Sequence, residues 1–259
     1  MRRLGRNRDG YRGDLLDVTR TLEACDAAAK AWGWQRELLP PDRLARPTYH
    51  RPAKREGLPK LYISSGIHGD EPAGPLAAQQ LLEEDQWPEA EIWLVPCLNP
   101  MGFQIGSRFN PEGWDINRDY RHLRTEEARG HVEWLQKLPP LDLTLLLHED
   151  WESHGFYTYE LNRKQHPSVA RAMIDAVREV CPIDESAWID GRPVSETGII
   201  RPDITPEERP EWPEAVWLRV HKCELSYTME APSDWPLQTR TRALVTAVRS
   251  AMQTFSSFQ

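Results

Sequence analysis

Residues 60–74 read KLYISSGIHGDEPAG: a short apolar run is followed at once by a histidine, two acids and three glycines. The apolar run predicts a buried strand, and Pro72 predicts the start of a helix, so the stretch is expected to be a βα turn. On that interpretation Gly66 and Gly69 supply unusual backbone angles and Asp70 caps the helix. A second interpretation makes His68 and Glu71, three residues apart, two ligands of one metal. The local spacing does not decide between them.

The bulk composition is that of an ordinary globular protein. The chain has 259 residues, 39% of them hydrophobic and 28% charged, and we expect a single domain over 1–259, with 1–59 as an N-terminal helix and irregular lead-in. A net charge of -8 argues against nucleic acid as a partner, because no net positive field displaces counterions from phosphates. No window reaches the roughly 18 apolar residues of a membrane span, and the basic N-terminus lacks the apolar core of a signal peptide, so we expect no membrane partner and a cytoplasmic location. Oligomeric state is left open.

Hydrophobic periodicity and turn residues predict an alternation of strands and helices. Strands are expected at 60–65, 91–98, 141–150, 156–161, 216–223 and 225–231, and helices at 15–34, 72–87, 125–138, 166–180 and 237–255. Three stretches are expected to be irregular: a connection at 40–59, a long loop at 101–121 and a proline-rich surface excursion at 182–215. The alternation indicates an α/β fold with a largely parallel sheet, whose active site lies past the carboxyl ends of the strands. The four cysteines lack a CxxC pair and are expected to be buried free thiols.

A candidate metal site combines the opening turn with a distant strand end. Two histidines and one glutamate, with an open position for water, are the ligand set of a catalytic zinc site. His68, Glu71 and His148 provide that set, and Zn²⁺, one per chain, is the expected cofactor. Taken singly, HxxE arises by chance, and a histidine at a strand end is more often a satisfied structural residue.

The loop SRFNPEGWDINRDYR (107–121) and the strand YTMEA (227–231) add the other groups that a hydrolase needs. Arg108 could polarise a carbonyl oxygen, and Arg118, next to the donor Asn117, could grip a carboxylate with its forked guanidinium. Asp115 could fix the tautomer of His68, and Glu230 could act as general base for a metal-bound water. The alternative for each arginine is a solvated loop charge.

Five runs of the sequence resemble the motifs of the zinc metallocarboxypeptidases, particularly the short bacterial single-domain members that include murein peptide amidases. The runs are GIHGDEP (66–72), LNPMG (98–102), SRFNPEGWDINRDY (107–120), LLLHED (145–150) and YTMEAPS (227–233). They occur in the family's order between positions 60 and 235. The resemblance implies a zinc carboxypeptidase-like (phosphorylase/hydrolase-like) fold. It further implies the roles given above: zinc ligation by the two histidines and Glu71, oxyanion stabilisation by Arg108, carboxylate binding by Asn117 and Arg118, support of His68 by Asp115, and proton transfer by Glu230.

The sequence also departs from the family pattern. Met101 and Asp119 stand where the family usually has Asp and Asn, and we expect Asp119 to weaken or redirect the grip of Arg118 on an anion. Family members often carry a substrate-capping tyrosine ahead of the catalytic glutamate, but 182–215 contains no tyrosine. The nearby candidates are Tyr157, Tyr159 and Tyr227.

The resulting hypothesis is an exopeptidase or amidase that cleaves a peptide or small amide next to a free carboxylate. The nearest alternative is a deacylase of N-acyl amino acids, of the succinylglutamate desuccinylase/aspartoacylase type. Two features are expected to count against the deacylase. Arg108 and Asn117 stand nine positions apart, which suits the carboxypeptidase pattern better than the tighter aspartoacylase spacing. Only 29 residues follow Glu230, too few for the extra C-terminal β domain of the deacylase type. Further alternatives are a non-catalytic peptide- or metabolite-binding module and a metal-independent interaction protein. A second metal site at Glu149, Asp150, Glu152 and His154 is less expected than a solvated acidic turn there.

Overall fold

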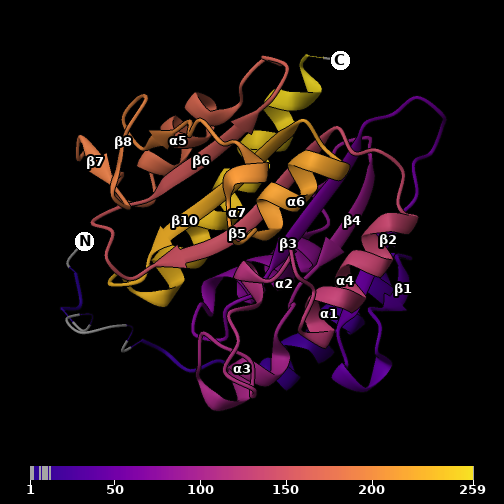
Figure 1. Cartoon of the computed structure of the whole chain (residues 1–259). Helices are drawn as coiled ribbons and strands as arrows, with labels where there is room; N and C mark the ends of the chain where they lie inside the picture. The colour runs from indigo at the N-terminus through magenta and orange to yellow at the C-terminus, as the bar shows by residue number, and fades with distance from the viewer. Residues whose placement is uncertain (1–2, 6, 8–10, 12, 259) are drawn as a thin grey trace.

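The computed structural model describes residues 3–5, 7, 11 and 13–258, and its centre is one eight-stranded sheet (Figure 1). The strand order is β1-β2-β4-β3-β5-β10-β6-β9, and a separate hairpin is formed by β7 and β8. The strands are β1 (Gln35–Leu38), β2 (Pro47–Arg51), β3 (Lys60–Ser65), β4 (Glu91–Val95), β5 (Leu143–Asp150), β6 (Tyr157–Asn162), β7 (Trp188–Ile189), β8 (Arg192–Pro193), β9 (Ile199–Ile200) and β10 (Leu225–Pro232). The helices are α1 (Val18–Ala31), α2 (Ala73–Glu84), α3 (Pro100–Ile105), α4 (Glu126–Lys137), α5 (Ala170–Arg178), α6 (Glu214–His221) and α7 (Leu237–Ser256), with short 3-10 turns at Asp42–Leu44, Ile116–Arg118 and Pro206–Glu208.

The sheet is mixed and mostly parallel. The pairs β3·β4, β3·β5, β5·β10 and β6·β9 are parallel, whereas β1·β2, β2·β4 and β6·β10 are antiparallel. From β3 the chain passes through α2 to β4 on one side, and then returns through α4 to β5 on the other side of β3. This reversal places a topological switch point between β3 and β5, which is where open α/β sheets bind their ligands.

Period-two alternation along the central strands divides the core into two layers. Leu61 and Ile63 belong to the apolar cluster that packs under α1, α2, α5 and α7, whereas Tyr62 between them belongs to the cluster under α4 and α6. Leu145 and Leu146 are separated between the two clusters in the same way. Figure 1 shows α4 and α6 in front of the sheet and α7, α2 and α1 behind it. Because both faces are covered, nearly all residues of β3 and β5 are buried, whichever face they point to, as is typical of parallel sheets.

Most predicted elements form, but three expectations about local structure are wrong. The strand expected at 216–223 is instead mostly helix: residues 216–221 belong to α6, which starts directly after Pro213 and buries Val216, Trp217 and Leu218 against the sheet. Their β-branched and aromatic side chains mimic a strand, because β propensity largely reflects burial. The supposedly irregular lead-in contains β1 and β2, which extend the sheet, and the loop after Asn99 begins with α3, capped by the Asn99 side chain.

The segment 182–215 is also more than a surface excursion. It contributes β9 to the sheet edge and the β7–β8 hairpin, and Ile189, Ile199 and Ile200 are buried. The hairpin turns through Asp190 and Gly191, both at positive φ (47° and 65°). Asp-Gly is a typical two-residue hairpin turn, so the hairpin carried a readable sequence signal.

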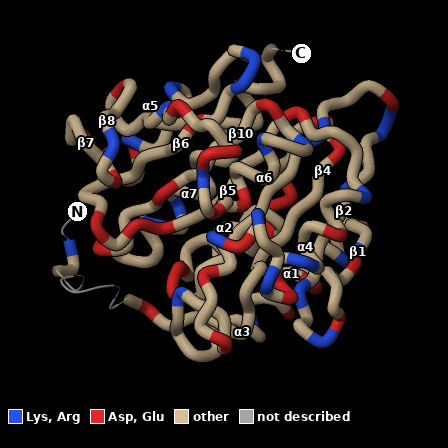
Figure 2. The backbone as a smooth tube through the Cα atoms, in the orientation of Figure 1, with Lys and Arg blue, Asp and Glu red and all other residues tan. Residues whose placement is uncertain are grey.

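The charged residues and the cysteines lie as expected for an ordinary globular protein. Figure 2 shows basic and acidic residues interspersed along the chain. All four cysteines (Cys25, Cys97, Cys181 and Cys223) are buried free thiols, as expected. Among the described residues, no helix is both long enough and apolar enough to cross a membrane.

A buried polar network ties α4 and α6 to β3. Glu214 accepts hydrogen bonds from the Tyr62 hydroxyl at 2.8 Å and from Ser64 Oγ at 2.9 and 3.0 Å. The Tyr62 oxygen lies 2.9 Å from His131 Nε2, and His131 Nδ1 lies 2.6 Å from the Tyr120 hydroxyl. Burial lowers the pKa of His131 well below 6.5, so the neutral ring accepts from Tyr120 and donates to Tyr62. Burial likewise raises the pKa of Glu214 to about 7, against the opposing effect of its hydrogen bonds from Tyr62 and Ser64.

This shift predicts how Glu214 affects stability against pH. The folded carboxyl keeps its proton up to about pH 7, whereas the unfolded one loses it near 4.5, so the folded state binds more protons in between and loses stability as the pH rises. The full shift corresponds to roughly 3 kcal/mol. When the pH is raised from 5 to 8, the free energy of unfolding of the wild type is therefore expected to fall by roughly 3 kcal/mol more than that of Glu214→Gln. Urea unfolding at both pH values measures the difference, and parallel losses in the two proteins would refute it.

Candidate active site

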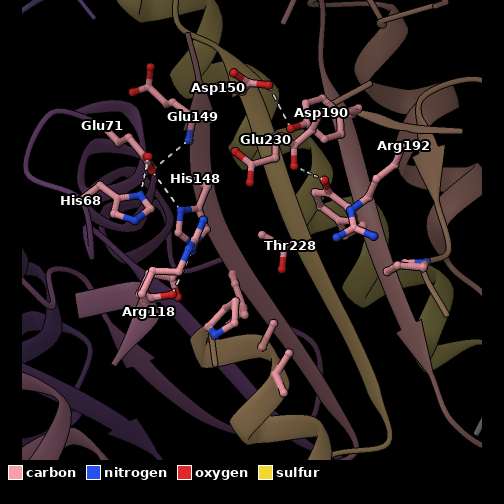
Figure 3. Close-up of a pocket in the computed structure, with 18 of the residues that line it drawn as sticks. His68, Glu71, Arg118, His148, Glu149, Asp150, Asp190, Arg192, Thr228 and Glu230 are labelled. Atoms are coloured by element: carbon pink, nitrogen blue, oxygen red, sulfur yellow. Dashed lines mark hydrogen bonds and ion pairs between the residues drawn. The ribbon is translucent and has the colours of Figure 1, made fainter. Parts of the chain in front are cut away.

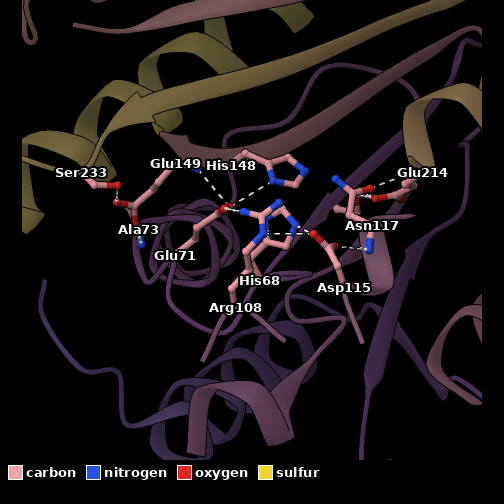
Figure 4. Close-up of polar contacts among 12 residues, drawn as sticks. His68, Glu71, Ala73, Arg108, Asp115, Asn117, His148, Glu149, Glu214 and Ser233 are labelled. Atoms are coloured by element: carbon pink, nitrogen blue, oxygen red, sulfur yellow. Dashed lines mark hydrogen bonds and ion pairs between the residues drawn. The ribbon is translucent and has the colours of Figure 1, made fainter. Parts of the chain in front are cut away.

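The structure brings His68, Glu71 and His148 together at the switch point between β3 and β5. One donor atom from each lies within 4.8 Å of the others, and all three side chains are buried. His68 Nδ1 lies 2.5 Å from Glu71 Oε1, and His148 Nδ1 lies 3.0 Å from Glu71 Oε2 (Figure 4). The two imidazole rings are 5.0 Å apart, centroid to centroid. Two nitrogen donors and a carboxylate therefore face one common point.

The electrostatics of this cluster fit a divalent cation. Burial alone would raise the pKa of Glu71, but His68 and His148 outweigh it and hold the pKa well below 4.5. The carboxylates of Glu71 and Asp115 raise the pKa of His68 against its burial, which reports a negative potential at the ring. Burial lowers the pKa of His148, which favours the neutral imidazole that binds metal. This donor set suits zinc.

The turn that carries His68 and Glu71 depends on close backbone packing. Gly66 takes a positive φ of 64°, and a Cβ on Gly69 would lie 2.2 Å from the Gly102 backbone and 2.4 Å from the Ser107 carbonyl oxygen. The turn can therefore lie directly against the chain at 102–107 only if residue 69 is glycine.

Asp70 does not cap the following helix, contrary to the sequence expectation. Helix α2 has no side-chain cap from its own turn, and the Ala73 N–H instead donates to Glu149 Oε1 at 2.6 Å. Glu149 is held from behind by the fully buried Arg240 and accepts from Ser233 Oγ at 3.1 Å. Glu149 is thus a buried structural anion rather than part of a solvated acidic turn, and it is not available as a ligand for a second metal. Among the described residues, the only cluster with metal-ligand geometry is the His68 group.

Asp115 organises the loop side of the site. Its Oδ1 accepts from the Asn117 N–H at 2.9 Å and lies 3.4 Å from His68 Nε2, a charge contact too poorly aligned for a hydrogen bond. Its Oδ2 accepts from Arg108 Nε at 3.0 Å, and Arg108 Nη1 reaches Glu71 Oε1 at 3.5 Å. Burial would raise the pKa of Asp115, but His68 and Arg108 bring it well below 3.8. One ionised carboxylate therefore positions a histidine, an arginine and the loop backbone together.

Asn117 and Arg118 lie on the same pocket wall. Asn117 Oδ1 accepts from the Glu214 N–H at 2.9 Å, so its Nδ2 donor is the free end of the amide. Arg118 donates to the Asn117 carbonyl at 2.9 Å. Asp119 faces elsewhere: its Oδ2 accepts from the N–H and hydroxyl of Thr125, the N-cap residue of α4, at 2.7 and 2.9 Å. In the described structure Asp119 forms no ion pair with Arg118, so the expected weakening of that arginine does not arise by pairing.

Glu230 approaches from the neighbouring strand. It pairs in register with His148 between parallel β10 and β5, so both side chains leave the same face of the sheet about 5 Å apart. Loss of hydration raises the pKa of Glu230 well above 4.5, and the charges of Glu71, Asp150 and Asp190 add to this. A carboxyl with a raised pKa beside a metal site is suited to proton transfer.

A cavity of about 370 Å³ joins these groups (Figure 3). Its wall includes every predicted site residue except Asp115, which lies behind His68 and Arg108. Tyr157 and Tyr159 line it too, donating to Asp150 and Asp190, whereas Tyr227 bonds to residues at the start of α5 and is not a candidate cap. Sequence reasoning missed Asp190, Arg192 and Arg209, which reach the pocket from the 182–215 segment.

Comparison with known proteins places this geometry in context. The family profile of the succinylglutamate desuccinylase/aspartoacylase catalytic domain matches residues 57–181. Murein peptide amidase A of Escherichia coli (strain K12) is 28% identical over 103 residues, which are 40% of this chain and 43% of that protein. The matches span less than half the length of each of the first curated relatives.

Solved structures extend the similarity over the whole fold. A protein from Shewanella denitrificans OS217, provisionally named a metallopeptidase, has a TM-score of 0.78 at 25% identity, with 92% of this chain and 90% of that chain covered. The chain is thus similar in sequence and fold to metallopeptidases and carboxypeptidases. A metallo-carboxypeptidase from Burkholderia cenocepacia shares the fold, with a TM-score of 0.69 at 14% identity over 95% of this chain and 70% of that one. The chain thus has the zinc carboxypeptidase-like fold expected from its sequence motifs, and its similarities to metallopeptidase- and carboxypeptidase-like proteins support a hydrolase.

The geometry of the site predicts the metal content of the protein. Protein purified without added metal is expected to hold about one zinc per chain, and His148→Ala to lose nearly all of it, because three protein ligands are the minimum of a catalytic zinc site. Elemental mass spectrometry measures both. His122→Ala, which removes an exposed imidazole bonded to the Pro210 carbonyl, is the control and should keep its zinc.

The His148 variant must be folded for this comparison. Circular dichroism checks it, and His148→Gln is the substitute if the alanine variant does not fold. A folded wild type that neither contains nor takes up zinc would overturn the assignment of the site.

Proposed function

We propose that this chain is a zinc-dependent hydrolase that cleaves a peptide or amide bond next to a free carboxylate, of the metallocarboxypeptidase or murein peptide amidase type. The observation that carries the proposal is the single cavity lined by the metal-ligand cluster, by Glu230 and by the pair Asn117 and Arg118. Such a reaction requires a metal site, a proton carrier and anion donors. The residues proposed for all three line the same cavity of about 370 Å³. The proposal treats residues 1–259 as one domain.

Substrate binding is assigned to the loop side of the pocket. The free amide donor of Asn117 and the guanidinium of Arg118 would hold the substrate's carboxylate, because a guanidinium matches a carboxylate with two parallel hydrogen bonds. A carboxylate fixed there allows cleavage only at the adjacent bond, which makes the protein an exopeptidase or amidase rather than an endopeptidase.

The remaining pocket residues would bind the metal, transfer protons and stabilise the negative charge that develops in the reaction. Zinc held by His68, Glu71 and His148 would supply Lewis-acid chemistry. Glu230 would take a proton from the attacking water and later deliver it to the departing amine, which its raised pKa favours. Arg108 would donate to the carbonyl oxygen as that oxygen gains negative charge, and its bond to Asp115 holds it at the site in advance.

A second candidate function is deacylation of N-acyl amino acids. The match of the succinylglutamate desuccinylase/aspartoacylase profile over 57–181 favours it, and the same metal, base and carboxylate groups would serve. In both reactions an amide next to a carboxylate is hydrolysed, so the candidates differ in the acyl group and not in the site.

A substrate screen tests the proposed function. Zinc-loaded protein is expected to release a free amino acid from at least one of three substrate classes: peptides with a free C-terminus, murein peptides and N-acyl amino acids. Glu230→Gln, with its zinc content verified, is expected to be at least about 10²-fold slower on that substrate, because the proton carrier is lost. Zinc-loaded wild-type protein that hydrolyses none of the three classes would contradict the proposal.

The position of Arg108 predicts a rate effect. Arg108→Ala is expected to lower kcat by about 10² to 10³ with little change in KM, since the lost donor acts mainly on the transition state. Steady-state kinetics on the substrate found by the screen measures both constants. Arg129→Ala is the matched control, because the exposed Arg129 side chain bonds only to the carbonyls of Leu123 and Arg124. Equal kcat values for the two variants would remove Arg108 from the mechanism.

A further inference from the structure

The pocket contains positive charge that the proposed reaction does not use. Arg192, at the start of β8, and Arg209, just after the 3-10 turn Pro206–Glu208, both line the cavity together with Arg118. Figure 3 shows Arg118 on the His148 side and Arg192 on the hairpin side, with Thr228 and Glu230 between them. Two arginines from the 182–215 segment therefore face a site whose own anion donors come from 117–118.

Neither of these arginines has an anionic partner in the part of the chain that the structure describes. The Arg192 and Arg209 side chains make no ion pair and no hydrogen bond there. Arg201, from the same segment, provides the contrast, because it is paired with Glu160 at 2.8 Å and with Glu196 at 2.7 Å. Of the three arginines in this segment, the one outside the cavity wall is paired with carboxylates, and the two that line the cavity are not.

The nearby acids do not neutralise them. Asp190, two residues before Arg192, accepts a hydrogen bond from the Tyr159 hydroxyl, and Asp150 accepts from the Tyr157 hydroxyl at 3.0 Å. Neither carboxylate lies within ion-pair distance of Arg192 or Arg209 in the described structure. The acids thus hold the two tyrosines in the wall and leave the guanidinium groups to the cavity.

Two further observations indicate that an acceptor from outside completes this wall. Arg209 is half-buried, and its Nε is shielded from solvent without any hydrogen-bond partner, a costly state that a bound oxygen would relieve. In addition, burial lowers the pKa of Arg209, and the positive charges of Arg192 and Arg118 lower it further. Like charges gathered without a counterion attract an anion.

We propose that Arg192 and Arg209 form a second anion subsite, beside the carboxylate site of Asn117 and Arg118, which selects substrates whose released amino acid carries an acidic side chain. This inference rests on the proposed function, which supplies the first carboxylate. A side-chain carboxylate offers the planar pair of oxygens that a guanidinium fork binds, whereas a side-chain amide offers one oxygen and an ammonium none.

Kinetic preference tests the subsite. Zinc-loaded protein is assayed with three N-acyl dipeptides that differ only in a C-terminal Glu, Gln or Lys. We expect kcat/KM for Glu to exceed that for its neutral isostere Gln by at least about tenfold, with Lys the poorest. In the double variant Arg192→Gln/Arg209→Gln the Glu-to-Gln ratio is expected to fall to about one. Arg129→Gln/Lys137→Gln removes two exposed charges of α4 and should keep the wild-type ratio.

A binding measurement separates this proposal from the proposed function. Calorimetric titration of the zinc-loaded protein with L-glutamate and with L-glutamine needs no turnover. We expect at least about tenfold tighter binding of L-glutamate, lost in the double variant and kept in the control. Binding preference without any hydrolysis would retain the subsite and reject the hydrolase.

Three results would reject the subsite. These are hydrolysis without preference for Glu over Gln, a preference for Lys, and equal or undetectable binding of L-glutamate and L-glutamine. The first of these would leave the hydrolase assignment standing.

Discussion

The buried carboxylate of Glu71 is the interaction on which the site depends. Its two oxygens face His68 from its own turn and His148 from β5, and the Glu149 backbone N–H donates to it at 3.1 Å. A buried carboxylate is costly unless charges and hydrogen bonds compensate it. Because these partners come from β3–α2 and from β5, compensating one charge joins the two strands at the switch point and sets the two imidazoles in place.

A second shielded anion supports the first from behind. Glu149 is bonded to Arg240, which also pairs with Asp14 at 2.8 Å, and to the Ala73 N–H at the start of α2. Along one strand, neighbouring residues point to opposite faces, so His148 faces the pocket while Glu149 anchors α2 and α7 beneath it. Strand geometry alone therefore gives the three residues of the sequence HED different positions: a proposed metal ligand, a structural anion and a pocket residue.

The sequence predicts the elements that carry strong periodicity or close spacing. KLYISS is the observed strand β3. The turn with His68 and Glu71, the strand that contains His148 and the strand that contains Glu230 also lie where their patterns indicate. The sequence predicts a strand where helix α6 forms, because the periodicity of a short apolar run does not distinguish a helix from a strand. The capping of α2 by Glu149 could not be foreseen, since the partners are 76 residues apart and only the folded sheet brings them together. The same holds for Arg192 and Arg209, which no motif singles out and which reach the pocket through tertiary structure.

The β7–β8 hairpin is separate from the eight-stranded sheet and is linked to β6 by the bond of Tyr159 to Asp190, on the side of the sheet away from β1. The proposed metal ligands and Glu230 all lie outside residues 184–213, whereas much of the opposite pocket wall comes from within that range. Changes in the length or composition of this excursion can therefore reshape what enters the cavity while the groups on β3, β5 and β10 keep their places. In evolution or in protein engineering, the part of the pocket wall from this segment can therefore change while the candidate site on the central strands is kept.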